Sequence, residues 1–427
     1  MILHFKVKNF RSYKDEVTFS MEANASELKS SNFIEFDNAA DQRFKILKVA
    51  LIYGANASGK TNIIRALYEL LYLIQYKPKV NQSLRVNEVF KLDRYSQNQP
   101  SEYTLTFLGP EQKKYTYSFS VLKDSILEEE LVYYPNGKKT TVFKRNPLEE
   151  LNTVQTGVLG DSFNKKIISV FENQLILSKF GDDEPHELLS KVYKYFDSFS
   201  VINATNEKHL DSLQRTTSKT LSEKKELLKK VQRLIKWGDT KIEDIIIVKQ
   251  IFDDRGKVIN DDRASSVGTN PYDVYGVHNV YEGDDIIDRY DMEFRNWSHG
   301  TQSLYKLGGE IITTLENGGI LIVDELDTSL HPFLTKMLLM MFQSTSTNPK
   351  NAQLIFTTHD VTLLDRDLIR RDQIWLAEKD EKGMTDLYSL QDFDDVREDT
   401  PFEKWYLAGK FGGLPKMNSV DSMFEFQ

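Results

Sequence analysis

The stretch LIYGANASGKT, residues 51–61, matches the phosphate-binding pattern GxxxxGK[ST] through Gly54, Gly59, Lys60 and Thr61. An apolar run precedes the stretch and predicts a strand, and the residues after it have the apolar spacing of a helix. In such a strand–loop–helix unit the glycines let successive backbone N–H groups face phosphate oxygens at the positive end of a helix. The stretch therefore predicts a nucleoside-triphosphate site on an α/β fold.

Several residues of this loop have predicted roles. We expect Lys60 to reach the β- and γ-phosphates and the hydroxyl of Thr61 to coordinate Mg²⁺. Asn56, Ser58 and Asn62 complete the loop residues that we expect at the nucleotide. ATP and Mg²⁺ are the cofactors that the motif indicates.

A second cluster with phosphate chemistry begins more than 250 residues later. The apolar run ILIV, residues 320–323, predicts a buried strand and ends in Asp324 and Glu325. Ligands of open α/β sheets collect at the carboxyl ends of the strands. We expect Asp324 to hold Mg²⁺ through water, with Thr61 on the same ion. Glu325 is the candidate to polarise the attacking water.

His359 follows the next apolar strand, QLIFT at residues 353–357. An imidazole just past this strand end can sense the γ-phosphate or orient a water molecule by hydrogen bonding. The patch DFDD at residues 392–395 imitates a metal site, but no upstream acidic strand accompanies it, and we interpret it as a solvated turn.

Composition narrows the class of protein. A length of 427 residues favours two or three domains, or one large α/β fold with insertions. The absence of cysteine excludes disulfides and thiol catalysis and fits a reducing cytosol. With neither a secretory signal nor an apolar run of 18 residues, we expect a cytoplasmic protein that makes no membrane contact.

The net charge of −9 argues against a protein that coats nucleic acid indiscriminately. A local basic patch exists at residues 219–236, where lysine and arginine alternate with apolar residues at helical spacing. We interpret it as a solvated helix face, and contact with nucleic acid or a partner remains the alternative.

The chain divides into three predicted regions. Residues 1–170 carry the loop motif and several runs typical of antiparallel strands, and residues 291–427 alternate strand and helix patterns, which indicates a mostly parallel sheet. Residues 171–290 form a variable insertion, mostly helical as far as about residue 237.

These motifs together resemble the ABC-type ATPase heads of the SMC, RecF and OLD superfamily. The family's signature corresponds to Ser298 and Gly300 in WSHGTQ, and its switch histidine to His359. His299 and Thr301 depart from the LSGGQ form found in transporters. NFRSY at residues 9–13 resembles the family's first-strand motif, which implies that Arg11 lies near the nucleotide.

The resemblance implies a shared site. In this family ATP is sandwiched between the loop of one subunit and the signature of another, so the chain is expected to form a homo-oligomer, at least a dimer. Asp327 takes the position of the residue that communicates between the two sites. The family's Q-loop glutamine is left open among Gln75, Gln97 and Gln99.

A narrower resemblance points to a bacterial anti-phage subgroup typified by RloA, AbiLi and AriA, the ATPase subunit of the PARIS system. It rests on GANASGKTNI, DELDTSLHP, residues 353–380, and WYLAGKFGGLP at residues 405–415. The subgroup implies an ATP-hydrolysing sensor and scaffold that controls a separate effector, a Toprim-like nuclease, with a phage-derived protein as a candidate trigger. The alternatives are a RecF-like clamp on DNA and a structural protein with vestigial ATP binding.

Overall fold

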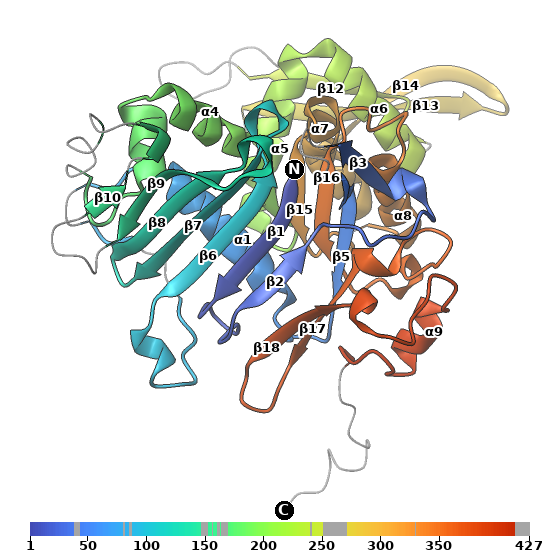
Figure 1. Ribbon diagram of the computed structural model, residues 1–427. Helices are drawn as coiled ribbons and strands as arrows, with labels where there is room; N and C mark the ends of the chain where they lie inside the picture. The colour runs from blue at the N-terminus through green and yellow to red at the C-terminus, as the bar shows by residue number, and fades with distance from the viewer. Residues whose placement is uncertain are drawn as a thin grey trace, which may run out of the picture.

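The computed structural model describes residues 1–37, 43–79, 82–84, 88–146, 153–155, 157–159, 163, 170–239, 241–250, 271–328 and 330–414. Within these ranges the strands form four sheets, and Figure 1 shows how the elements are arranged. Two of the sheets are large and make up the body of the molecule.

A six-stranded sheet carries the predicted site. Its strand order is β11-β15-β16-β5-β17-β18, and every neighbouring pair is parallel except β17 with β18. The order places β16 between β5 and β15, so the strands that lead into the P-loop, the acidic pair and His359 are neighbours and end at the same edge of the sheet. The strands are β5 (Val49–Tyr53), β11 (Phe199–Asn203), β15 (Ile320–Asp324), β16 (Gln353–Thr357), β17 (Ile374–Lys379) and β18 (Thr385–Ser389).

Both faces of this sheet are covered, because its central strands are buried at every position and mostly apolar. Val49 and Leu51 face one apolar core, while Ala50 and Ile52 face another. The first core is closed by the helices α5 (Glu207–Glu223), α6 (Lys225–Gly238), α7 (His299–Asn317) and α8 (Pro332–Gln343). The second is closed by α1 (Lys60–Gln75) and the other large sheet.

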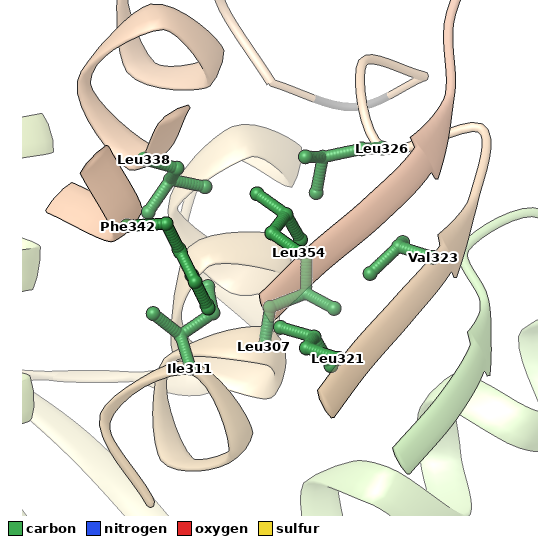
Figure 2. Close-up of a pocket in the computed structure, with 8 residues that line it drawn as sticks. All are labelled: Leu307, Ile311, Leu321, Val323, Leu326, Leu338, Phe342 and Leu354. Atoms are coloured by element: carbon green, nitrogen blue, oxygen red, sulfur yellow. The ribbon is translucent and has the colours of Figure 1, made fainter. Parts of the chain in front are cut away.

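Packing between α7, α8 and the sheet is tight. Leu307 and Ile311 of α7 and Leu338 and Phe342 of α8 gather around Leu354 of β16, as Figure 2 shows. The gap between these side chains has no room for a water molecule. This region is therefore apolar core, which supports the strand that carries Asp324.

The second large sheet is an antiparallel lobe with the strand order β10-β9-β8-β7-β6-β1-β2. Buried and partly exposed side chains alternate along most of β1 and β7, as expected for strands with one more solvated face. The strands are β1 (Ile2–Lys8), β2 (Val17–Ser20), β6 (Ser101–Leu108), β7 (Lys114–Leu122), β8 (Ser125–Tyr133), β9 (Thr140–Asn146) and β10 (Thr153–Gln155). The predicted α/β class, with a mostly parallel core and an antiparallel lobe, is confirmed.

Gln353 joins the two large sheets at a buried position. Its side-chain oxygen accepts the backbone N–H of Ile2 at 2.6 Å, and its amide nitrogen donates to the carbonyls of Ile2 at 3.1 Å and Leu47 at 3.0 Å. A buried amide with its hydrogen bonds satisfied fixes the position of the lobe against the strand β16 that leads to His359.

The stretch before residue 238 is mostly helical, as predicted, but it contains one strand that was not predicted. The helices α4 (Glu187–Tyr195), α5 and α6 form, but β11 lies among them and pairs in parallel with β15. Only Ile202 of β11 is fully buried, so its side chains lack the apolar run that marks a central strand. Backbone pairing along the edge of the sheet, which no local pattern reports, stabilises it there.

The remaining elements are smaller. A three-stranded antiparallel sheet contains β12 (Asp244–Lys249), β13 (Tyr272–Glu282) and β14 (Asp285–Glu293), and a two-stranded sheet contains β3 (Phe33–Asp37) and β4 (Arg43–Leu47). Two short helices are α3 (Ile176–Ser178) and α9 (Phe402–Leu407). In the described part of the chain, no helix combines the length and apolar character needed to cross a membrane.

Candidate nucleotide-binding site

The P-loop has the backbone that its glycines predict. Gly54 has φ +152° and Gly59 has φ +110°, a region that side-chain-bearing residues rarely adopt. A Cβ atom at Gly54 would lie 2.4 Å from the carbonyl oxygen of Ala377, and one at Gly59 would lie 2.4 Å from Oγ1 of Thr385. Asn56 and Ala57 form the exposed tip of the loop. The loop therefore tolerates only glycine where it touches β17 and β18.

Lys60 opens α1 and folds back over the loop. Its side chain is buried, and Nζ donates to the carbonyl oxygens of Gly54 at 2.8 Å and Ala55 at 3.0 Å. Burial lowers the pKa of Lys60 from its ordinary value, while the charges of the nearby acids oppose the shift. An ammonium group has three donors, so a third N–H of Lys60 is available to a phosphate oxygen.

Asp324 lies where the elements of the site meet. Its Oδ1 accepts hydrogen bonds from Oγ1 of Thr61 at 3.1 Å and from Oγ1 of Thr357 at 2.8 Å. Burial raises the pKa of the Asp324 carboxyl, and the two hydroxyl donors oppose that shift. Thr61 and Asp324, which are 263 positions apart, are thus in direct contact.

This pair fits a magnesium ion. Mg²⁺ is commonly bound by one or two carboxylates with phosphate oxygens and water filling the other positions. The described residues contain no cluster of three or more His, Cys, Asp or Glu side chains, so the protein supplies few ligands of its own. Thr61 and Asp324 would hold the ion, which would neutralise charge on the phosphates.

Glu325 has a strained backbone. Its φ is +57°, which is uncommon for a glutamate and costs about 1–3 kcal/mol. Its N–H donates to Oγ1 of Thr357 at 2.7 Å, and its carboxylate accepts from Thr328 at 3.1 Å. Thr357 therefore fixes both acids, because its hydroxyl donates to Asp324 and accepts from Glu325. Such strain at the end of a buried strand is typical of functional sites.

Asp327 connects the acidic cluster to the switch position. Its Oδ2 accepts the backbone N–H of His359 at 3.1 Å, while its Oδ1 is buried with no hydrogen-bond partner among the described residues. The His359 side chain is exposed. Partial burial lowers the pKa of His359, and the positive charge of Lys60 lowers it further against the opposing charges of Asp327, Glu325 and Asp324, which favours the neutral imidazole. A neutral imidazole can both donate and accept a hydrogen bond.

The signature residues lie at the start of α7. Ser298 is the N-cap of this helix, and its Oγ accepts the N–H of Thr301 at 3.2 Å and contacts Oγ1 of Thr301 at 2.7 Å. Thr301 donates in turn to Asp239 at 3.1 Å. Ser298 is exposed and Gly300 half-exposed. In the described ranges, no hydrogen bond joins Ser298 or Gly300 to the P-loop of the same chain.

Four supporting residues were missed from the sequence: Ser12, Tyr13, Thr357 and Thr385. Tyr13 donates its hydroxyl to the carbonyl of Gly59 at 3.1 Å. Asn62 donates to Oγ of Ser12 at 2.7 Å, Ser12 and Thr385 share a hydrogen bond of 2.8 Å, and Thr385 donates to the carbonyl of Ser58 at 2.7 Å. The hydroxyls of Ser12 and Thr385 can thus each donate once and accept once in a chain that ends on the P-loop. Ser12 and Tyr13 lie within NFRSY, but that motif pointed only to Arg11, and no sequence pattern indicated Thr357 or Thr385 as supporting residues.

The remaining predicted residues differ in whether the structure places them near the P-loop. The Arg11 guanidinium pairs with Glu88 at 2.7 Å and lies over the ring of Phe10, while its neighbours Ser12 and Tyr13 reach the loop. A nucleotide contact by Arg11 stays a prediction. Ser58 is buried, and its Oγ has no partner in the described part of the chain. Residues 392–395 lie in an exposed turn, as predicted. The choice among Gln75, Gln97 and Gln99 stays open.

Residues 49–365, about three quarters of the chain, match the model of a protein family described as "AAA domain, putative AbiEii toxin, Type IV TA system". The chain belongs to this family. The matched range begins with β5 and contains the P-loop, the signature, both acids and His359. A domain of this kind binds nucleotide. The matched range contains the motif residues that form the site described above.

Solved structures similar to the chain include the SMC head domain from Thermotoga maritima, at 13% identity with a TM-score of 0.41, covering 91% of this chain and 98% of that one. An SMC head bound to the C-terminal winged-helix domain of ScpA has 15% identity and a TM-score of 0.38 over 91% and 97% of the two chains. RecF with ATP has 14% identity and a TM-score of 0.37 over 91% and 97%. These values carry no functional argument. No curated protein matches the chain.

The hydroxyl chain predicts a positioning role for Thr385. Thr385→Val keeps the shape of the side chain but leaves the carbonyl of Ser58 and the hydroxyl of Ser12 without this partner. We expect ATP affinity, measured by titration calorimetry, to fall by about five- to tenfold, since a lost buried hydrogen bond costs about 1–1.5 kcal/mol. Thr106→Val, at a buried Thr106–Thr116 contact in the lobe, is the matched control and should leave affinity unchanged. Equal affinities of the two variants would exclude the role.

Two substitutions at Glu325 separate the effect of its positive φ on stability from the effect of its carboxylate on ATP hydrolysis. Glu325→Gly relieves the left-handed strain and should raise the free energy of unfolding by up to about 1 kcal/mol. Glu325→Gln keeps the strain and should leave stability near that of the wild type. Both variants should lose ATP hydrolysis, measured as phosphate release. A Glu325→Gly protein less stable than Glu325→Gln in thermal unfolding would show that the backbone is not strained there.

Proposed function

We propose that the chain is an ATPase that hydrolyses ATP at a site completed by a second copy, and that it controls a separate effector in an anti-phage system. The observation that carries the proposal is the contact of Asp324 with Thr61 and Thr357 beside Lys60. This contact brings together, at one sheet edge, the P-loop, the residues proposed to hold magnesium and a glutamate with a positive φ.

The proposed reaction is the transfer of the γ-phosphoryl group to water. Glu325 accepts a proton from a water molecule while the oxygen of that water bonds to the γ-phosphorus. The bond between the γ-phosphorus and the oxygen that bridges it to the β-phosphate breaks, which releases ADP and phosphate. Lys60 and the N–H groups of the loop stabilise charge on the phosphate oxygens. The neutral imidazole of His359 orients the water or senses the γ-phosphate.

A second copy is proposed because the signature is displayed outward. Ser298 and the first turn of α7 present a hydroxyl and free N–H groups to solvent, and a helix N-terminus of this kind favours an anion. The buried Oδ1 of Asp327 has no hydrogen-bond partner among the described residues, so it is free to accept a hydrogen bond. ATP bound by Lys60 of one copy and Ser298 of the other would make assembly depend on nucleotide state.

The anti-phage role rests on the subgroup motifs and on the family description, which names a toxin of a type IV TA system. We propose that the effector is a Toprim-like nuclease on another chain, and that a phage-derived protein triggers its release. ATP-dependent assembly gives such a system its switch, because the effector can bind one assembled form and leave the other.

Complementation between two inactive variants tests the shared site. Lys60→Ala removes the loop lysine and Ser298→Arg blocks the signature, and each alone should hydrolyse no ATP. In a mixed dimer one of the two sites combines the intact loop of one chain with the intact signature of the other. Mixing equal amounts should restore about a quarter of the wild-type rate, since half the dimers are mixed and each has one intact site. A mixture as inactive as its parts would place the whole site within one chain.

Co-purification tests effector control. The chain is expressed with the product of the neighbouring gene and captured through a tag, with ATP, with ADP and without nucleotide. The neighbour should be retained with one nucleotide state and released with another, and Glu325→Gln should hold the ATP-bound outcome in every sample that contains ATP. Retention that is the same in all three conditions would contradict control by nucleotide, and nuclease activity of the purified chain alone would contradict a separate effector.

A further inference from the structure

An antiparallel ribbon projects from the body of the molecule. It consists of β13 and β14, which are joined by a turn at Gly283, and Figure 1 shows it extending beyond the helices at the upper right. The strand order β12-β13-β14 makes β14 an edge strand. A Cβ atom added at Gly283 would meet nothing within 4 Å, so the tip of the ribbon is surrounded by open space.

The outer half of the ribbon exposes three large apolar side chains. Tyr281, Ile286 and Ile287 are exposed at 56%, 58% and 57%. A bulge brings them together, since Tyr281 pairs with Ile286 and Val280 with Asp288, which leaves Ile287 as the extra residue. Three large apolar side chains exposed at one place are expensive in water.

An acidic rim surrounds these apolar side chains. Glu282, Asp284, Asp285 and Asp288 are exposed, and no cation among the described residues forms an ion pair with them. Acidic residues protect edge strands from aggregation, which accounts for the charges. It does not account for the apolar trio, which fits a surface that is covered by another molecule.

The same chain carries a surface of the opposite charge. α6 exposes the aromatic ring of Trp237 at 72%, and Arg233 lies one helical turn before it. Lys225 and Lys229 continue this basic stripe toward the start of the helix. Arg233 and Lys225 form no ion pair with a described residue, whereas Lys229 forms an exposed ion pair with Glu226 of the same helix at 2.8 Å. The stripe therefore has basic groups and an aromatic ring, the complement of the acidic and aliphatic ribbon.

The stripe and the ribbon lie at the same end of the molecule. Gln232 of α6 donates to the carbonyl of Ile245 in β12 at 3.2 Å, and β12 pairs with β13 at the base of the ribbon. Tyr281, Ile286 and Ile287 are exposed in a chain that includes α6, so this helix does not cover the ribbon of its own chain. A two-fold rotation that places the ribbon of one copy on α6 of another also places the second ribbon on the first helix.

We propose that the ribbon docks on α6 of a second copy of this chain, with Tyr281, Ile286 and Ile287 against Trp237 and the acidic rim against Arg233 and Lys229. The contact is self-complementary and closes with two copies. It uses neither the P-loop nor the signature, so it forms without nucleotide and differs from the ATP-dependent contact of the proposed function.

Charge exchange in the full-length protein tests this contact. Sedimentation velocity over a concentration series, without nucleotide and at about 0.1 M salt, should show a dimer that weakens at about 0.5 M salt. Asp285→Lys with Asp288→Lys should weaken association by about tenfold or more, as should Lys229→Asp with Arg233→Asp. The protein carrying all four changes should recover association, because the charges are exchanged and complementary again.

An apolar pair of variants completes the test. Ile287→Ser should weaken the dimer, and Leu28→Ser, at an equally exposed residue far along the sequence, should not. ATP binding by every variant shows that the fold is intact. A monomer up to about 100 µM without nucleotide, or a dimer that the ribbon changes leave unaffected, would overturn the proposal. So would a failure of the fourfold variant to recover, whether or not the ATP-dependent assembly survives.

Discussion

The two hydrogen bonds that Thr61 and Thr357 donate to Asp324 are the interaction on which the site depends. They join α1, β15 and β16, which come from distant parts of the sequence. A buried carboxylate is costly, and its raised pKa records that cost. Two hydroxyl donors offset part of it, and a divalent cation at the same oxygen atoms would offset more. The arrangement holds a negative charge where the phosphates of a nucleotide need a cation.

The order of strands turns this local contact into a complete site. Because β16 lies between β5 and β15, the loop that carries Lys60, the acids and His359 extend from three adjacent strands. Gln353 ties β16 to the antiparallel lobe, and the apolar core under α7 and α8 closes the opposite face of the sheet. The packing of the sheet thus fixes the positions of the strand ends, and the loops that follow these strands carry the functional side chains.

Much of the site could be predicted because many of its functional residues lie in short sequence motifs. The spacing of Gly54, Gly59 and Lys60 reflects a local backbone requirement, and Asp324 follows a recognisable buried strand. Thr385 carries no such signal, and the motif that contains Ser12 pointed only to Arg11, since the roles of both hydroxyls depend on the pairing of β18 and on a segment near the N-terminus reaching the same loop. The strand β11 was missed for a similar reason, because its place depends on pairing with β15 and hardly on its own apolar pattern.

The most direct test of the account is the position of the metal. Crystals of the chain grown with Mn²⁺ and a non-hydrolysable ATP analogue give an anomalous signal that locates the ion. We predict a single strong peak within coordination distance of the Thr61 hydroxyl and one water molecule away from Asp324, with the triphosphate wrapped by residues 54–61. A peak elsewhere, or a nucleotide bound away from this loop, would contradict the claim that the Thr61–Asp324–Thr357 contact organises the site.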